Sequence, residues 1–125
     1  MQPMLWVTNA LNTTAYDKID GQDCIDYWRS KHPGRDDKTC RFTKRNAVGN
    51  DIIVGGHVIS VYVKEPKVYI TPILKSVNSG NDRQIFAVDI DDLARVPKEQ
   101  EEAILRDPDN VMLVYSLKRK AKQWL

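Results

Sequence analysis

Cysteine and histidine are scarce in this sequence, which contains two of each among 125 residues. Small secreted domains that depend on disulfides carry several cysteine pairs. The amino terminus also shows no basic segment followed by an apolar run that would direct export. We therefore expect Cys24 and Cys40 to be free thiols, buried as small apolar side chains, in a cytoplasmic protein.

Long apolar runs and common cofactor motifs are missing as well. The longest apolar stretches lie around Ile52–Val54 and Val111–Tyr115, far short of the roughly 20 residues that cross a bilayer. The sequence contains no Walker-type, dinucleotide-binding, zinc-protease, hydrolase-elbow or C-x-x-C motif. We therefore expect neither membrane association nor a bound cofactor.

What the sequence does contain is an ordinary globular composition. Hydrophobic residues make up 42% and charged residues 29%, so the chain can bury a modest core without disulfides or metal. No internal repeat, low-complexity segment or linker divides it. We predict a single domain spanning residues 1–125, and the sequence leaves its oligomeric state open.

Strand and helix patterns follow one another irregularly along the chain, without the repeated strand–helix–strand units of a parallel sheet. This order predicts a small α+β domain with a central hairpin, a short helix after it, and flanking helices and strands. Helices are predicted at Gly21–Lys31 and Pro97–Arg106, and a turn at 107–110. Strands are predicted at Pro3–Ala10, Gln84–Val88 and Val111–Ser116.

The central hairpin is predicted from the high β-branched and aromatic content between residues 52 and 72. Its strands are expected at His57–Val63 and Val68–Thr71, joined by a turn at 64–67. Pro72 lacks an N–H and is expected to end the second strand, so that Ile73–Ser79 begins a short helix. The Gly55-Gly56 doublet is typical of a bulge or of a close approach between backbones.

Charge is unevenly distributed, although the net charge is only +2. Residues 27–45 hold seven cations against two acids, residues 82–109 hold nine acids against four cations, and the tail at 116–125 holds four cations and no acid. Basic clusters contact nucleic-acid phosphates, but they also occur on surfaces balanced by internal ion pairs, and both interpretations stay open. The candidate phosphate-contacting residues are Arg29, Lys31, Arg35, Lys38, Arg41, Lys44, Arg45, Lys118, Arg119, Lys120 and Lys122.

The segment from Cys40 to Val88 resembles an HNH-type nuclease module. In that family a cysteine-containing turn precedes a strand with a general-base histidine, a hairpin follows, and a short helix carries metal ligands and a structural asparagine. The strand GGHV at 55–58 and the segment YITPILKSVNS at 69–79 carry the resemblance. It implies a ββα-like core at about residues 40–88, with His57 as the base and Asn78 as the asparagine.

The metal ligands of that family are largely missing here, and its chemistry requires a metal at the scissile phosphate. Gly56 stands where a ligand precedes the base, and Leu74 and Val77 stand at the cysteine or histidine positions that follow the proline. Two further ligand positions fall near Thr43 or Lys44 and near Phe86 or Ala87. The resemblance therefore implies a degenerate module that binds no metal.

Two alternatives concern the same residues. A rearranged zinc site would need all four of the residues Cys24, His32, Cys40 and His57, whose spacings match no familiar finger. The plainer interpretation makes His57 a hydrogen-bonded strand residue and Asn78 a residue that shapes a turn.

Three functions remain open at this point. The resemblance and the basic segments favour a non-catalytic protein that binds nucleic acid or a nucleoprotein complex. The second is a protein-interaction module or inhibitor, of the kind that phages and mobile elements encode, acting on a nuclease or defence complex. The third is an active HNH nuclease that uses His57. For the protein-interaction module, the residues expected to contact the protein partner are Asp89, Asp91, Asp92, Glu101 and Glu102.

Overall fold

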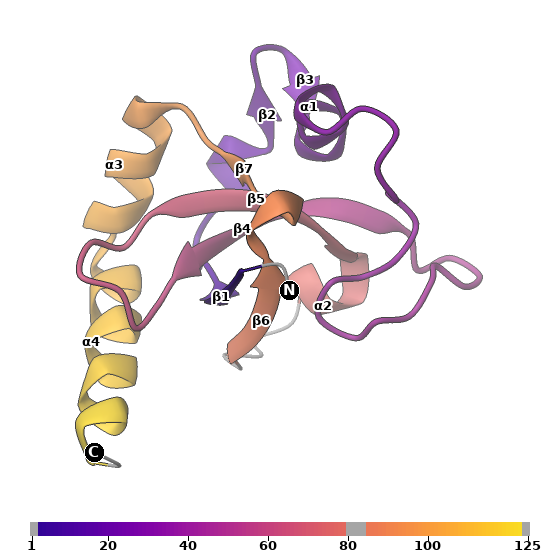
Figure 1. The fold of residues 1–125 in the computed structure, drawn as a ribbon. Helices are drawn as coiled ribbons and strands as arrows, with labels where there is room; N and C mark the ends of the chain where they lie inside the picture. The colour runs from indigo at the N-terminus through magenta and orange to yellow at the C-terminus, as the bar shows by residue number, and fades with distance from the viewer. Residues whose placement is uncertain (1–2, 80–84, 124–125) are drawn as a thin grey trace.

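An antiparallel sheet lies at the centre of the protein (Figure 1). The structure is a computed structural model that describes residues 3–79 and 85–123. The strands are β1 Met4–Asn9, β2 Lys18–Ile19, β3 Gln22–Asp23, β4 Ile53–Ser60, β5 Val68–Leu74, β6 Ile85–Asp89 and β7 Ala94–Arg95. The main sheet has the order β6–β1–β4–β5–β7, and β2 pairs with β3 apart from it.

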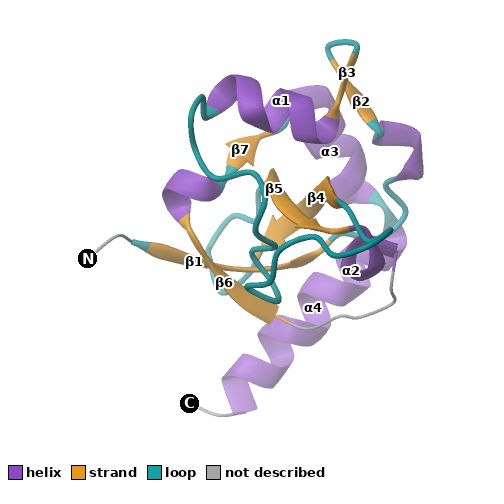
Figure 2. Cartoon of the chain, turned by 90° about the vertical axis from the view of Figure 1, so that its right-hand side faces the viewer, coloured by secondary structure: helices purple, strands orange, loops and turns teal. Residues whose placement is uncertain are grey.

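Helices flank this sheet, and the mixed α+β class predicted from the sequence is confirmed (Figure 2). The helices are α1 Cys24–Lys31, α2 Lys75–Ser79, α3 Lys98–Arg106 and α4 Pro108–Gln123, with 3-10 turns at Thr14–Tyr16 and Ile90–Asp92. Helix α1 packs over β4 and β5, and α3 and α4 follow each other along one end of the sheet (Figure 1). None of the helices in the described ranges is long and apolar enough to span a membrane.

The sheet buries apolar side chains on both faces, because alternate residues of a strand point to opposite sides. Ile59 of β4 belongs to the cluster under α1, together with the fully buried Trp28. Its neighbour Val58 belongs to a second cluster with Val7 and Ile73 on the other face. Each such side chain contributes about 1.5–3 kcal/mol on burial, so β4 anchors both halves of the core.

The predicted hairpin is present as β4 paired with β5, but Pro72 does not end its second strand. Pro72 lies inside β5, opposite Gly55. Its carbonyl accepts a 2.9 Å hydrogen bond from the backbone N–H of Arg41, so its backbone nitrogen also faces away from β4 and no bond of that ladder is lost. The helix expected at 73–79 is therefore the shorter α2, which begins at Lys75.

The strand predicted at Val111–Ser116 is wrong, because this segment belongs to helix α4. Its β-branched content is typical of a strand, but Leu113 and Leu117 lie four residues apart and are buried in one cluster. The Asp107 carboxylate accepts a 2.9 Å hydrogen bond from the N–H of Asp109, which caps a helix that begins at a proline. The cap and the apolar stripe together outweigh strand propensity.

Asn110 joins the start of α4 to the loop that follows β1. Its Oδ1 accepts a 2.7 Å hydrogen bond from the N–H of Leu11, and its Nδ2 donates to the carbonyls of Leu11 and Ile104, both at 3.0 Å. Because Asn110 is buried, these three bonds form away from water. They fix the loop at 10–14 against the junction of α3 and α4.

We predict that Asn110→Ala lowers the free energy of unfolding by about 2–3 kcal/mol, because it leaves backbone groups of Leu11 unpaired in the interior. Met112→Ala removes an exposed side chain of the same helix and serves as the control, with a change within about 0.5 kcal/mol. Urea unfolding monitored by circular dichroism measures both. An equal, small effect of the two substitutions would show that Asn110 does not fix the loop.

Candidate functional site

The two residues expected to form a catalytic pair lie on opposite faces of β4. A Cβ built on Gly56 would lie 3.1 Å from Oδ1 of Asn78, so that face of the strand looks toward α2. The next residue, His57, points to the opposite face, where its Nε2 lies 3.1 Å from Oε1 of Gln100 in α3. His57 and Asn78 therefore line one cleft from two sides and do not converge on one atom.

His57 is a buried, neutral imidazole. Only 4% of its surface is exposed, and this burial lowers its pKa below the ordinary value of 6.5, against the smaller opposing effect of the Gln100 hydrogen bond. Because Gln100 presents its carbonyl oxygen, the Nε2 of His57 carries the proton and donates. This geometry matches the plainer interpretation, a hydrogen-bonded strand residue.

The four side chains of the rearranged zinc set have separate surroundings. The Cys24 thiol lies 3.5 Å from the carbonyls of Tyr16 and Asp17, and burial raises its pKa to about 11. Nε2 of His32 lies 2.9 Å from the carbonyl of Leu93. Cys40 is buried in the core cluster on the other face of the sheet. Within residues 3–79 and 85–123, no three His, Cys, Asp or Glu side chains gather as a metal site would require, and both cysteines are free, as predicted.

Arg41 is not an exposed cation, and it leaves the set of candidate phosphate contacts. Its guanidinium donates to the carbonyls of Asp36 and Thr39, both at 2.5 Å, and its Nε lies 3.2 Å from the Asp92 carboxylate. It also lies over the Trp28 ring, 5.4 Å from the centroid. The side chain is only 8% exposed, so a phosphate has no access to its donors.

Other cations of the basic segment also pair with acids of this chain. Arg29 bridges Asp26 at 2.7 Å and Asp37 at 2.6 Å. Arg35 bridges Asp92 at 2.5 Å. Burial alone would raise the pKa of Asp92, but hydrogen bonds from Arg35 and Arg41 outweigh it and hold that pKa below its ordinary value. The basic segment is thus partly neutralised by the acidic stretch that was expected to bind a protein partner.

Two of the proposed acidic contacts are internal as well. Glu101 is buried, receives a 3.0 Å hydrogen bond from the N–H of Val68 and pairs with Arg95 at 2.9 Å. Asp92 is held by arginines, and Asp89 accepts from the N–H of Asp91. The side chains of Lys120 and Lys122 lie outside the described part of the chain. The exposed candidates are Arg29, Lys31, Arg35, Lys38, Lys44, Arg45, Asp91, Glu102, Lys118 and Arg119.

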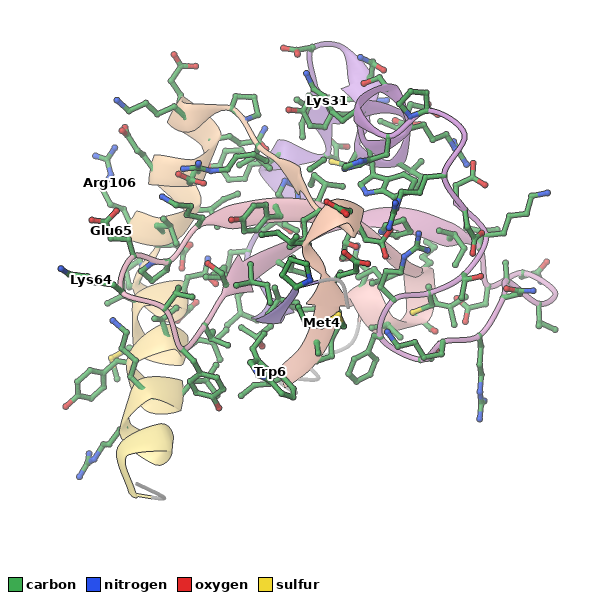
Figure 3. The ribbon with its side chains drawn as sticks, in the orientation of Figure 1. Met4, Trp6, Lys31, Lys64, Glu65 and Arg106 are labelled. Atoms are coloured by element: carbon green, nitrogen blue, oxygen red, sulfur yellow. The ribbon has the colours of Figure 1, made fainter. Side chains whose placement is uncertain are left out.

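Among the described residues, exposed cations occur on several different elements. Lys31 lies on α1, whereas Arg106 of α3 and Lys64 of the loop next to it lie on another side of the molecule (Figure 3). Lys118 and Arg119 stand on the last turns of α4, and Lys44 already donates to the carbonyl of Arg41 at 2.7 Å. A nucleic-acid backbone needs several cations along one path, and the cations on α1, α3 and α4 lie on separate elements.

A cleft of about 700 Å³ opens where β1 ends beside the first residues of β4. Its volume lies within the usual range for ligand pockets. The loop after β1, the start of α1, the start of β4 and α2 form its walls, with Ile25, Ile52 and Val54 among the apolar residues. The polar side chains that line it are Asn9, Asn12, Thr13, Thr14, Asp17, Asp23, His57 and Asn78.

The backbone of β4 is unpaired along this cleft. The carbonyl of His57 accepts a 2.9 Å bond from Ala10, the last contact with the β1 side. Residues two apart in a strand direct their N–H and C=O groups to the same side, so Gly55 directs both toward the cleft. The other edge of β4 is paired with β5, where Gly55 faces Pro72. Among the described residues, no backbone group of a neighbouring strand pairs with the N–H and C=O of Gly55 on this side.

Two features make this edge sterically and chemically specific. A Cβ on Gly55 would lie 2.6 Å from backbone atoms of Cys24 and Ile25, so α1 closes one side of the cleft, and the close backbone approach predicted for the glycine doublet is confirmed. Asn9 is 8% exposed, and its Oδ1 has no hydrogen-bond partner among the described groups. A buried acceptor without a donor is costly, and this one belongs to a residue that lines the cleft.

No protein-family model, curated protein or solved structure matches this chain.

We predict that Arg41→Met lowers the free energy of unfolding by about 3 kcal/mol, because it leaves Asp92 partly buried with one cation fewer. Arg45→Met makes the same chemical change at an exposed position and should stay within about 0.5 kcal/mol of the native protein. Chemical denaturation of both variants at neutral pH measures the difference. Equal stabilities would return Arg41 to the candidate phosphate contacts.

We further predict that stability falls as the pH is lowered through His57's range. The unfolded chain protonates this histidine near its ordinary pKa of 6.5, but the folded chain, with its lowered pKa, resists protonation. The unfolding free energy should therefore decrease from about pH 7 downward, by at most about 1.4 kcal/mol per pH unit. His57→Gln should flatten the profile between about pH 7 and 5.5, above the usual carboxylate range. Parallel profiles for the two proteins would contradict this assignment.

Proposed function

We propose that this chain is a non-catalytic protein-binding module whose partner docks in the cleft beside β4. The observation that carries the proposal is the chemistry of the cleft walls. Two carboxylates, Asp17 and Asp23, line the cleft with carboxamides and hydroxyls, and none of the described residues that line it is an arginine or lysine. Such walls favour a ligand that brings hydrogen-bond donors and positive charge.

The same chemistry disfavours nucleic acid as the ligand of this cleft, because phosphates are repelled by carboxylates. Outside the cleft, Arg41 is buried against Asp92 and closed to a phosphate, and the exposed Arg29 and Arg35 are already paired with acids of this chain. These contacts support the protein-interaction hypothesis over the nucleic-acid hypothesis. They also support a non-catalytic role, since His57 and Asn78 approach the cleft from opposite faces of β4.

The proposal predicts weak binding to nucleic acid. Fluorescence anisotropy with single-stranded DNA, duplex DNA and RNA at 50 and 200 mM salt should give only the non-specific affinity of a mildly basic protein, with Kd of about 10⁻⁴ M or weaker. Tight, salt-sensitive binding that the double charge reversal of Lys44 and Arg45 abolishes would replace the proposal with the nucleic-acid hypothesis.

The proposal also predicts a protein contact at the cleft. A photo-crosslinker placed at Thr13, on the cleft wall, should capture one protein from a nuclease-treated extract of the native cell. Asp17→Lys should suppress this product, and Glu99→Lys, an equal charge change at an exposed site on α3 outside the cleft, should not. A product that is insensitive to Asp17→Lys would place the partner elsewhere on the surface.

A further inference from the structure

The open edge of β4 suggests how a partner is held, on the basis of the function proposed above. We infer that the cleft takes an extended peptide segment that adds as a strand beside residues 52–55, where β4 begins, with a lysine or arginine side chain at Asp17. The segment would occupy the position that β1 would fill if β1 continued beyond Asn9.

The backbone pairing is the first support for this inference. Gly55 directs its N–H and C=O into the cleft, on the side that β1 has left. An extended peptide supplies a matching acceptor and donor at the spacing of a strand, as it does wherever an exposed sheet edge gains a strand. Four consecutive residues at the start of β4 line the cleft, Ile52 and the first three residues of the strand, Ile53–Gly55, so the added segment would cover about 13 Å.

The side-chain chemistry is the second support. Asp17 has no ion-pair partner among the described residues, and Asp23 pairs only with Lys18, at an exposed position. An exposed pair contributes little to stability and exchanges at low cost. A basic side chain of the peptide could therefore form an ion pair with Asp17 without breaking a buried interaction of this protein.

The unpartnered amide is the third support. Asn9 lies at the end of β1, next to the position of the added strand. Among the described residues, its side chain makes one hydrogen bond, a long one of 3.4 Å from Nδ2 to the carbonyl of Val77. A small rotation of this side chain would offer Oδ1 to a backbone N–H of the peptide. Asn78, on the far wall, provides a second carboxamide that faces the cleft.

The test is a library of capped hexapeptides in which lysine and β-branched residues alternate, titrated against the native chain by NMR. We expect at least one member to bind, to shift the Gly55 amide resonance and to slow its exchange with solvent. The same peptide N-methylated at alternate residues loses the backbone donors and should bind at least tenfold more weakly. Asp17→Lys should weaken binding of the parent peptide at least tenfold, and the control Glu99→Lys less than twofold.

Failure of the whole library to bind, or equal binding of the N-methylated peptide, would overturn strand addition. Binding with an unshifted Gly55 amide would also overturn it. If the crosslink at Thr13 persists and still depends on Asp17 in that case, the protein-binding function stands and only its mode is wrong. If neither peptide binding nor the Asp17-dependent crosslink is observed, both strand addition and protein binding at the cleft are wrong. Preferential binding of a single-stranded oligonucleotide would assign the cleft to nucleic acid.

Discussion

The ion pair between Arg41 and Asp92 is the interaction on which the arrangement of this fold depends. Arg41 belongs to an irregular loop, and its backbone N–H is bonded to Pro72 in β5 while its guanidinium lies over Trp28 of α1. The carbonyl of Asp92 accepts from the Trp28 indole at 2.9 Å and from the Thr71 hydroxyl at 3.0 Å. One buried cation and one carboxylate residue therefore hold a loop, a helix and the sheet together. Removing one partner of such a pair lowers the free energy of unfolding far more than losing an exposed ion pair. The loop that holds Arg41 and the turn that holds Asp92 are therefore constrained together.

This constraint changes the meaning of the charge blocks along the sequence. A basic segment followed at a distance by an acidic one resembles two recognition surfaces, but folding brings them together, and Arg35 and Arg41 both contact Asp92. The consequence is that Arg41 and Asp92, which the sequence places in two separate charge blocks, form one internal site. The cleft lies apart from this site and is lined by Asp17 and by Gly55.

Patterns that depend on neighbouring residues could be predicted from the sequence, and patterns that depend on tertiary contacts could not. The β-branched content around β4 and the proline before α3 are local signals, so the hairpin and that helix were predictable. The place of Pro72 inside a strand depends on Arg41, which is distant in the sequence, and α4 depends on burial of Leu113 and Leu117 against other elements. The cleft was also unpredictable, since its walls come from four separate segments. The glycine doublet was the one local signal of the cleft. It indicated that another backbone segment lies close to β4, but not which segment this is.

The bonds between Asn110 and Leu11 connect residues that are 99 positions apart. Leu11 lies in the cleft wall, so this wall is completed only after synthesis has passed Asn110 and α4 has begun to form. Contacts of such long sequence separation are also among the slowest to form during folding. A nascent or truncated chain that ends before Asn110 would therefore lack the bonds that hold this wall of the cleft in place.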